Sequence, residues 1–215
     1  MLLEGDVGNI SKEEKKYISD VYGSSRRLTA LVKSLLNTSR VDMGLLSVEP
    51  EPTNVEQLVG LVIKDLSPQI KKQKIDFEKK ITKGLPLINL DPKLFEMVFQ
   101  NLLSNSIKYN HPGGKVSLSI TKNRKVLKIK VKDTGIGIPL NQQKKVFTKL
   151  FRADNVNKVD VSGTVLGLYL AKAIIDQSDG KIWFESKLDK GTTFYIEVPL
   201  KGMKSKSGTR KLEKM

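Results

Sequence analysis

The chain has 215 residues, no cysteine, one histidine and a formal net charge of +15 at pH 7. A chain without cysteine has no disulfide framework, no thiol nucleophile and no cysteine-ligated zinc site. The single histidine, His111, also excludes a metal site built from several histidines. The length suits one or two domains.

No apolar run approaches the ~18 residues that a membrane-crossing helix needs. The first ten residues, MLLEGDVGNI, are too acidic and too short for a secretory signal. The sequence therefore predicts a cytoplasmic chain.

Residues 11–46 have the pattern of one long helix. Ser11 followed by Glu14 forms a capping box, and Gly44 suits a helix stop. Apolar residues spaced three or four apart form a stripe, namely Ile18, Val21, Leu28, Leu31, Val32, Leu35 and Leu36. Such a stripe is typical of a helical bundle or coiled coil, so the helix needs partner helices.

A Pro- and Glu-rich stretch after this helix predicts a domain boundary, which divides the chain into residues 1–47, 48–200 and 201–215. The second part is expected to contain helices at 54–73, 91–109, near 139 and at 166–178, and strands at 74–81, 115–121, 125–132, 180–186 and 192–199. Asp91 and Pro92 suit the N-cap and first position of a helix. Paired strands with segregated helices predict an α+β fold with two layers.

Two segments are strongly basic. Residues 201–215 carry a net charge of +5 and almost no large apolar side chains, which predicts a disordered tail. Residues 122–132 alternate lysine with apolar residues, which favours a half-buried strand with a lysine-rich outer face. A nucleic-acid surface is the alternative. Aromatic residues are not interleaved there and most basic residues are lysine, so we expect no specific nucleic-acid partner.

The helix expected at 91–109 contains the sequence QNLLSNSIKYN. At 100° per residue, Asn101, Asn105 and Lys108 share one face, and Tyr109 lies beside them. Asparagine is a poor residue for a helix interior, but its amide oxygen suits a hard cation, and a lysine suits a polyphosphate. An ordinary solvated face is equally compatible with this spacing.

Two glycine-containing segments are candidate ligand loops. In VKDTGIGIP, Gly135 and Gly137 allow a close approach of backbone to ligand, and Asp133 can accept a hydrogen bond from an exocyclic amine. In SGTVLGLYLAKAI, Gly163 and Gly167 flank a helix start, where free backbone N–H groups favour phosphate. Neither segment is a Walker A loop or a dinucleotide fingerprint. A plain turn and a plain helix start remain the alternatives.

Five motifs in one order, QNLLSNSIKYN, DTGIGIP, VFTKLFRADN, GTVLGLYLAK and GTTF, resemble the ATP-binding domain of sensor histidine kinases, which belong to the GHKL or Bergerat-fold ATPases. The resemblance covers roughly residues 48–200. The segment SSRRLTALVKSLLNTSRVDMG resembles the second helix of the dimerisation and phosphotransfer domain of the same kinases. The resemblance implies a two-layer α/β sandwich of the Bergerat type, preceded by a long bundle-forming helix.

The resemblance also implies roles for individual residues. Asn105 matches the Mg²⁺ ligand and Asn101 its companion, while Tyr109 lies beside the nucleotide. Lys108 and Arg152 match phosphate-contacting residues, which with Asn105 make up the implied catalytic set. Asp133 matches the acceptor of the adenine amino group. The other residues implied in nucleotide binding are Gly135, Gly137, Gly163, Gly167 and Leu168. Phe147 and Phe151 match the phenylalanine box, and Gly191 opens the last motif.

This chain departs from the family pattern in two places. The lid sequence G-T-G-L-G-L has Val165 at its middle glycine, and a β-branched residue resists positive φ, so we expect a restricted lid. The H-box with the phosphoacceptor histidine is absent, and MLLEGDVGNIS resembles the turn that follows the acceptor helix. His111 follows the N box and is interpreted as a solvated turn residue.

The implied function is that of an ATP-dependent protein histidine kinase, acting in a two-component system with ATP and Mg²⁺. The acceptor is expected on a dimerisation helix outside this chain, so that autophosphorylation in cis is excluded for the chain by itself. Expected partners are a response regulator receiver domain and a second kinase copy in the intact protein. The alternatives are another GHKL ATPase, such as an anti-sigma-factor serine kinase, and a nucleotide-binding pseudokinase or regulatory module.

Overall fold

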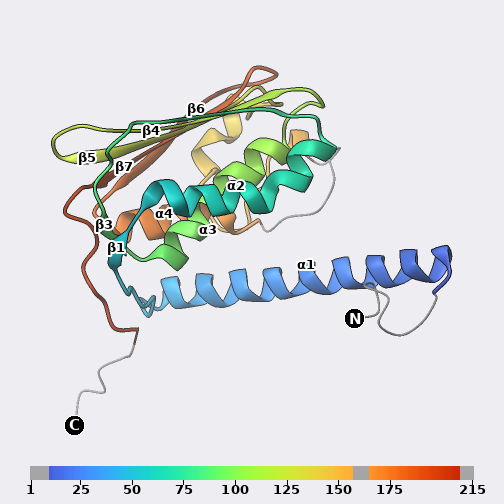
Figure 1. Ribbon diagram of the computed structural model, residues 1–215, viewed down its shortest axis with the longest axis horizontal. Coiled ribbons are helices and arrows are strands. Elements are labelled where there is room, and N and C mark those ends of the chain that lie inside the picture. Colours follow the sequence, from blue (N-terminus) through green and yellow to red (C-terminus); the bar gives the residue numbers. More distant parts are fainter. Residues whose placement is uncertain (1–9, 157–164, 209–215) are drawn as a thin grey trace, which may run out of the picture.

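The computed structural model describes residues 10–156 and 165–208. A long helix, α1, lies along one side of an α/β domain, and the helices of that domain cover one face of a five-stranded sheet (Figure 1). This architecture confirms the expected α+β class, with a two-layer sandwich preceded by a long helix.

Helix α1 (Lys12–Asp42) begins with the expected capping box. The Ser11 hydroxyl accepts from the Glu14 N–H at 3.1 Å, and the Glu14 carboxylate accepts from the Ser11 N–H at 2.7 Å. Gly44 follows the helix with a φ of +68°, a left-handed conformation that suits glycine after a helix end. The apolar stripe remains exposed, with Val21 at 68% and Leu28 at 65%. An uncovered stripe of this kind needs a partner surface.

The main sheet has the strand order β2-β4-β5-β7-β6. Its strands are β2 (Asp76–Ile81), β4 (Lys115–Lys122), β5 (Val126–Asp133), β6 (Lys181–Lys187) and β7 (Gly191–Pro199), and every pair is antiparallel except β2 with β4. In β5, the side chains of Leu127, Ile129 and Val131 are buried while the alternating lysines are exposed. This pattern confirms the interpretation of the segment as a half-buried strand with a lysine-rich outer face.

Helices α2 (Val55–Lys72), α3 (Pro92–Lys108) and α4 (Gly167–Gln177) cover the inner face of the sheet. Helix α3 lies between the other two, and its Phe95, Phe99 and Leu102 side chains are fully buried. The helix expected near residue 139 is a 3₁₀ turn, η2 (Leu140–Lys145), and a second one, η3 (Asp154–Val156), follows. A small sheet of β1 (Glu51–Thr53) and β3 (Ile88–Leu90) was not expected from the sequence.

Within the described residues, 201–208 follow β7 and contact the domain, whereas the sequence indicated disorder from residue 201. The Met203 N–H donates to the Asn89 carbonyl at 2.7 Å, and Lys206 pairs with Val48 in an antiparallel bridge. Met203 is only 6% exposed. Composition indicated disorder because these contacts are backbone hydrogen bonds and one buried side chain, which leave little trace in a hydropathy pattern.

Among the described residues, no helix combines the length and the apolar character that crossing a membrane requires.

Asp91 joins the start of α3 to the segment that leaves α1. It caps α3 by accepting from the Leu94 N–H at 3.1 Å, as expected, and its second oxygen accepts from the Glu49 N–H at 2.9 Å. The carboxylate is buried, so both donors lose their partner if it is removed.

We expect Asp91→Ala to lower the free energy of unfolding by about 2–3 kcal/mol, because the buried Leu94 N–H at the start of α3 and the Glu49 N–H both lose their acceptor. Asn54→Ala is the matched control, since Asn54 caps α2 through one exposed hydrogen bond to the Gln57 N–H, and about 1 kcal/mol is expected there. Denaturant unfolding measures both losses. Equal losses would contradict the structural role given to the Glu49 bond.

Candidate functional site

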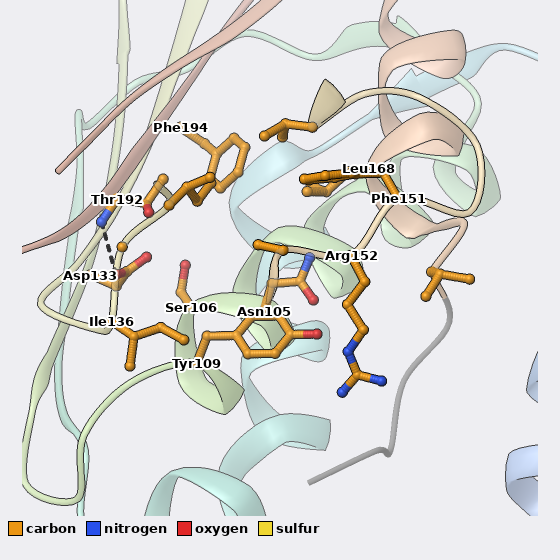
Figure 2. A pocket seen from close by; sticks show the side chains of 15 residues that line it. Asn105, Ser106, Tyr109, Asp133, Ile136, Phe151, Arg152, Leu168, Thr192 and Phe194 are labelled. Carbon is orange, nitrogen blue, oxygen red and sulfur yellow. Dashed lines mark hydrogen bonds between the residues drawn. The ribbon is translucent and has the colours of Figure 1, made fainter. Parts of the chain in front are cut away.

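The candidate site is a pocket between α3, the loop after β5, the segment before the gap in the described chain, the start of α4, and β7 (Figure 2). Apolar side chains make up most of its wall, and a few polar groups point into it. The lining residues are Asn105, Ser106, Tyr109, Asp133, Ile136, Gly137, Ile138, Val146, Phe151, Arg152, Ala153, Val165, Leu168, Thr192 and Phe194.

Asp133 lies at the end of β5 and is 7% exposed. Its Oδ1 accepts from the backbone N–H groups of Gly135 and Thr192, both at 3.0 Å (Figure 2). Burial raises the pKa of this carboxyl, and the two backbone hydrogen bonds oppose that rise. The result is a buried acceptor fixed in orientation at one end of the pocket.

The glycines around Asp133 are required for close packing of the chain against itself. A Cβ on Gly191, which has a φ of +96°, would overlap the Asp133 carbonyl oxygen. Gly191 therefore lets Thr192 approach the carboxylate. Gly135 packs in the same way against the Tyr109 carbonyl, and Gly137 packs against the Lys187 carbonyl with a φ of +64°. Only Gly137 of these last two lines the pocket itself.

Ser106 and Thr192 are pocket residues that sequence reasoning missed. The Ser106 hydroxyl points toward Asp133 (Figure 2), is buried, and has no hydrogen-bond partner among the described residues. A buried hydroxyl without a partner indicates that a ligand or water completes it. Its position directly after Asn105 in the motif was the available signal.

The apolar wall consists of aromatic and aliphatic side chains from several elements. Phe151 and Leu168 lie close together on one side of the pocket, and Ile136 lies across from them (Figure 2). Phe147 does not line the pocket; its ring packs edge-to-face on Phe184 at 5.7 Å between centroids and supports the wall from behind. A flat heterocycle would be sandwiched well by such a wall.

Cationic side chains lie at the other end of the pocket. The Arg152 side chain extends past the Tyr109 ring, with the tyrosine hydroxyl facing it (Figure 2). Burial raises the pKa of Tyr109, and the charge of Arg152 partly opposes this shift. Lys108 does not line the pocket, but its Nζ lies 4.9 Å from the centroid of the Tyr109 ring. Two basic side chains are therefore gathered around Tyr109.

The face of α3 that borders the pocket is rotated from the one expected. It presents Asn105, Ser106 and Tyr109, whereas Asn101 lies one turn earlier and packs its amide against Gly167, where a Cβ would overlap it. Gly167 opens α4 as expected and is needed for that contact. Gly163 lies outside the described residues.

Val165, the residue that stands at the middle glycine of the lid pattern, lines the pocket.

The pocket offers few side chains that could ligate a metal ion. No group of three or more His, Asp or Glu side chains in residues 10–156 and 165–208 could hold a metal ion. Asn105 contributes an amide oxygen to the pocket (Figure 2). Mg²⁺ commonly takes only one or two protein ligands and completes its shell with substrate phosphates and water. These residues fit an ion that arrives with a polyphosphate.

Comparison with known proteins identifies the family. Residues 90–202 match the family described as "Histidine kinase-, DNA gyrase B-, and HSP90-like ATPase". Sensor histidine kinase WalK of Bacillus subtilis is 31% identical over 188 residues, covering 86% of this chain and 31% of WalK. Circadian input-output histidine kinase CikA of Synechococcus elongatus is 28% identical over 200 residues, covering 92% of this chain and 26% of CikA. The chain thus spans about a quarter to a third of these two relatives.

Solved structures of histidine kinases also resemble this chain. The catalytic domain of histidine kinase ThkA is 27% identical with a TM-score of 0.60, covering 70% of this chain and 95% of that domain. Full-length ShkA in complex with AMPPNP shares the fold, with a TM-score of 0.74 at 20% identity, covering 96% of this chain and 42% of ShkA. The chain belongs to the histidine kinase-, DNA gyrase B- and HSP90-like ATPase family, as a catalytic domain of the sensor histidine kinase type. This confirms the resemblance and the Bergerat-type fold.

Because the pKa of Asp133 is raised in the folded state, the stability of the fold should depend on pH. Protonation of this carboxyl stabilises the folded state, a contribution that is fully present below the ordinary pKa of 3.8 and is lost as pH rises through the native value. At pH 7 the wild-type chain therefore carries a buried charge that Asp133→Asn removes while an oxygen remains for both N–H donors.

We expect Asp133→Asn to be as stable as the wild type or more stable at pH 7, with the difference shrinking as pH falls toward 4. Asp133→Ala leaves two backbone N–H groups unpaired and should lose about 2 kcal/mol. Urea unfolding between pH 4.5 and 8 measures all three proteins. A large loss for Asp133→Asn at pH 7 would contradict the structural account.

Proposed function

We propose that the chain is the catalytic part of a two-component sensor histidine kinase, which binds ATP with Mg²⁺ and transfers the γ-phosphoryl group to a histidine outside this chain. The observation that carries this proposal is the pocket itself, in which a buried carboxylate acceptor and an apolar slot lie at one end and the Arg152 side chain lies at the other, with Lys108 over the nearby Tyr109 ring. The family supports the ATP-binding activity.

The base end of the pocket suits adenine. Asp133 offers a fixed, charged acceptor to the 6-amino group, and the unpartnered Ser106 hydroxyl can bond a ring nitrogen or a bridging water. Phe151, Leu168 and Ile136 would cover the faces of the ring. This end would distinguish adenine from guanine by hydrogen bonding. The 6-oxo group of guanine is an acceptor, so it would face the acceptor oxygen of the carboxylate without a hydrogen bond.

The open end suits the phosphates. Arg152 and Lys108 would neutralise negative charge, and the backbone N–H groups at the start of α4 after Gly167, against which Asn101 packs, would favour an anion. A bound Mg²⁺ would supply positive charge that stabilises the negative charge developing on the leaving group. Asn105 is the residue proposed to ligate it, with its amide oxygen toward the pocket.

The transfer itself needs little covalent chemistry from this chain. An imidazole nitrogen attacks the γ-phosphorus, an N–P bond forms, the bond to the β-phosphate oxygen breaks, and ADP leaves. The chain contributes positioning and charge stabilisation. His111 is exposed on the turn after α3 and does not line the pocket, so the acceptor is proposed to come from a dimerisation helix outside this chain.

A response regulator receiver domain is the proposed downstream partner. The neighbour ThkA was solved in complex with response regulator protein TrrA, and this chain matches that kinase with a TM-score of 0.66 at 26% identity, covering 89% of this chain and 52% of ThkA.

Nucleotide selectivity tests the base end. We expect the wild-type chain to bind ATP at least 100-fold more tightly than GTP, because the 6-oxo group of guanine would face the Asp133 carboxylate. Asp133→Asn should weaken ATP binding by at least tenfold and narrow the ATP-to-GTP ratio, since the amide N–H₂ can donate to the 6-oxo group. Titration calorimetry with both nucleotides measures this. An unchanged ratio in the variant would remove Asp133 from base recognition.

Phosphoryl transfer tests the function as a whole. Incubation of the chain with γ-labelled ATP, Mg²⁺ and a separate two-helix domain carrying an acceptor histidine should give acid-labile, base-stable phosphohistidine. We expect Asn105→Ala to lower the transfer rate by about 100-fold or more. Asn141→Ala, an exposed asparagine outside the pocket, is the control and should leave the rate unchanged. If the chain binds ATP but forms no phosphohistidine, the kinase proposal is wrong and the chain is a nucleotide-binding regulatory module.

A further inference from the structure

Three side chains join the end of α1 to the domain in one cluster, which we call the Asp42 cluster. Asp42 is the last residue of α1, and its Oδ1 accepts a hydrogen bond from the Tyr169 hydroxyl at 2.6 Å. Its Oδ2 forms an ion pair with the Lys149 Nζ at 2.5 Å. The same Nζ lies 5.2 Å from the centroid of the Tyr169 ring, so that each member contacts the other two.

The Asp42 cluster holds the two chain segments that form one wall of the pocket. Lys149 lies two residues before Phe151 in the chain, and Tyr169 directly follows Leu168. Phe151 and Leu168 both line the pocket and lie close together in Figure 2. One carboxylate from α1 therefore ties together, from outside the pocket, the backbones that carry these two side chains.

Two local features of the cluster are unfavourable by themselves. An acidic residue at a helix C-terminus is opposed by the helix dipole, and Asp42 is the final residue of α1. Leu150, between Lys149 and Phe151, has a φ of +58°, which is strained for a bulky side chain. Both features lie directly beside the contact between Lys149 and Asp42.

Charge further favours the cluster near neutral pH. The Lys149 ammonium and then the Tyr169 hydroxyl lower the pKa of Asp42, and Asp42 in turn raises the pKa of Lys149. The Asp42 and Lys149 side chains are 33% and 46% exposed, so water moderates their attraction. The cluster is therefore a contact of modest strength that can form and open.

From this placement we propose that Asp42 is a positioning residue for nucleotide binding, which couples the docked position of α1 to the pocket wall formed by Phe151 and Leu168. The identity of the nucleotide rests on the proposed function. Because coupling between two equilibria is reciprocal, a ligand that fixes the wall also favours docked α1, and docked α1 raises the affinity for the ligand.

Other contacts between α1 and the domain lie at the same end of α1 as Asp42. The Asn37 amide donates to the Met97 sulfur at 3.5 Å, and Thr38 is only 4% exposed. Earlier along the helix, Tyr17 and Val21 are 65% and 68% exposed. Small changes at the Asp42 cluster are thus magnified along the 31 residues of α1.

Nucleotide affinity tests the coupling. In the full chain, Asp42→Asn, Lys149→Gln and Tyr169→Phe should each weaken Mg-ATP binding by about threefold to tenfold. The double variant of Asp42 and Lys149 should be no weaker than the worse single variant, because both lose the same contact. Thermal unfolding midpoints should stay unchanged, which separates positioning from a purely structural role.

The matched control is Asp176→Asn. Asp176 is an exposed carboxylate on α4 that pairs with Lys172 at 3.0 Å and does not line the pocket, so its loss should leave affinity unchanged. Wild-type affinity in all three cluster variants, tighter binding, or strictly additive losses would each overturn the coupling. Failure of the wild-type chain to bind ATP would instead overturn the proposed function.

A spin-label distance between α1 and α2 measures the position of α1 relative to the domain without any ligand. The chain has no cysteine, so Lys16→Cys on α1 and Lys64→Cys on α2 accept spin labels as a unique pair. With labelled protein diluted in unlabelled protein, the distance distribution should be narrow in the wild type and clearly broader with Asp42→Asn. The Asp176→Asn background should match the wild type. An unchanged distribution in Asp42→Asn would show that the cluster does not hold α1.

Discussion

The buried carboxylate of Asp133 is the constraint on which the pocket depends. A charge with so little exposure is tolerated only where hydrogen bonds replace water, and here the Gly135 and Thr192 N–H groups supply them. Gly135 lies two residues after Asp133 in the chain, whereas Thr192 lies 59 residues after it. One side chain therefore fixes the loop after β5 and the start of β7 in a common position. Gly191 follows from it, because any larger residue would overlap the Asp133 carbonyl.

The same burial prepares the chemistry of the site. A carboxylate with a raised pKa and restricted orientation is a strong acceptor that gains most from a donor placed in a dry slot. Under the proposed function, the apolar wall that excludes water would also supply the faces against which adenine packs. Recognition of the base would then be linked to stability of the fold, since both would depend on the hydrogen bonds that Asp133 accepts.

Sequence predicted the elements whose signals are local. The Ser11 capping box, the Asp91 cap and the alternation along β5 all appear in the structure as expected. The elements that were missed depend on long-range backbone pairing: β1 and β3 are three residues each, and Lys206 pairs with Val48 across most of the chain. Such short pairings carry no periodicity that a sequence pattern could reveal.

Within the site, motif residues were easier to predict than their surroundings. Asn105, Tyr109, Asp133, Arg152 and Leu168 do line the pocket, although their roles stay proposals. Ser106 and Thr192 were missed because a small hydroxyl residue in a helix or strand has no distinctive pattern. Gly135, which was expected to admit a ligand, and Gly191, which opens the last motif, both allow the close approach of one backbone segment to another. Spacing identifies a glycine but not what comes close to it.

The two kinds of surface on α1 differ in how readily they can separate. Its apolar stripe gains free energy roughly in proportion to the area that a partner covers, so a helix packed along it is held over many residues. Its contact with the domain ends instead on Asp42, Lys149 and Tyr169, a partly exposed polar cluster with a modest net gain. Water can replace each of these bonds at small cost. Under the proposed coupling, the catalytic domain would therefore change its angle to α1 more readily than α1 would leave a helix packed on its apolar stripe.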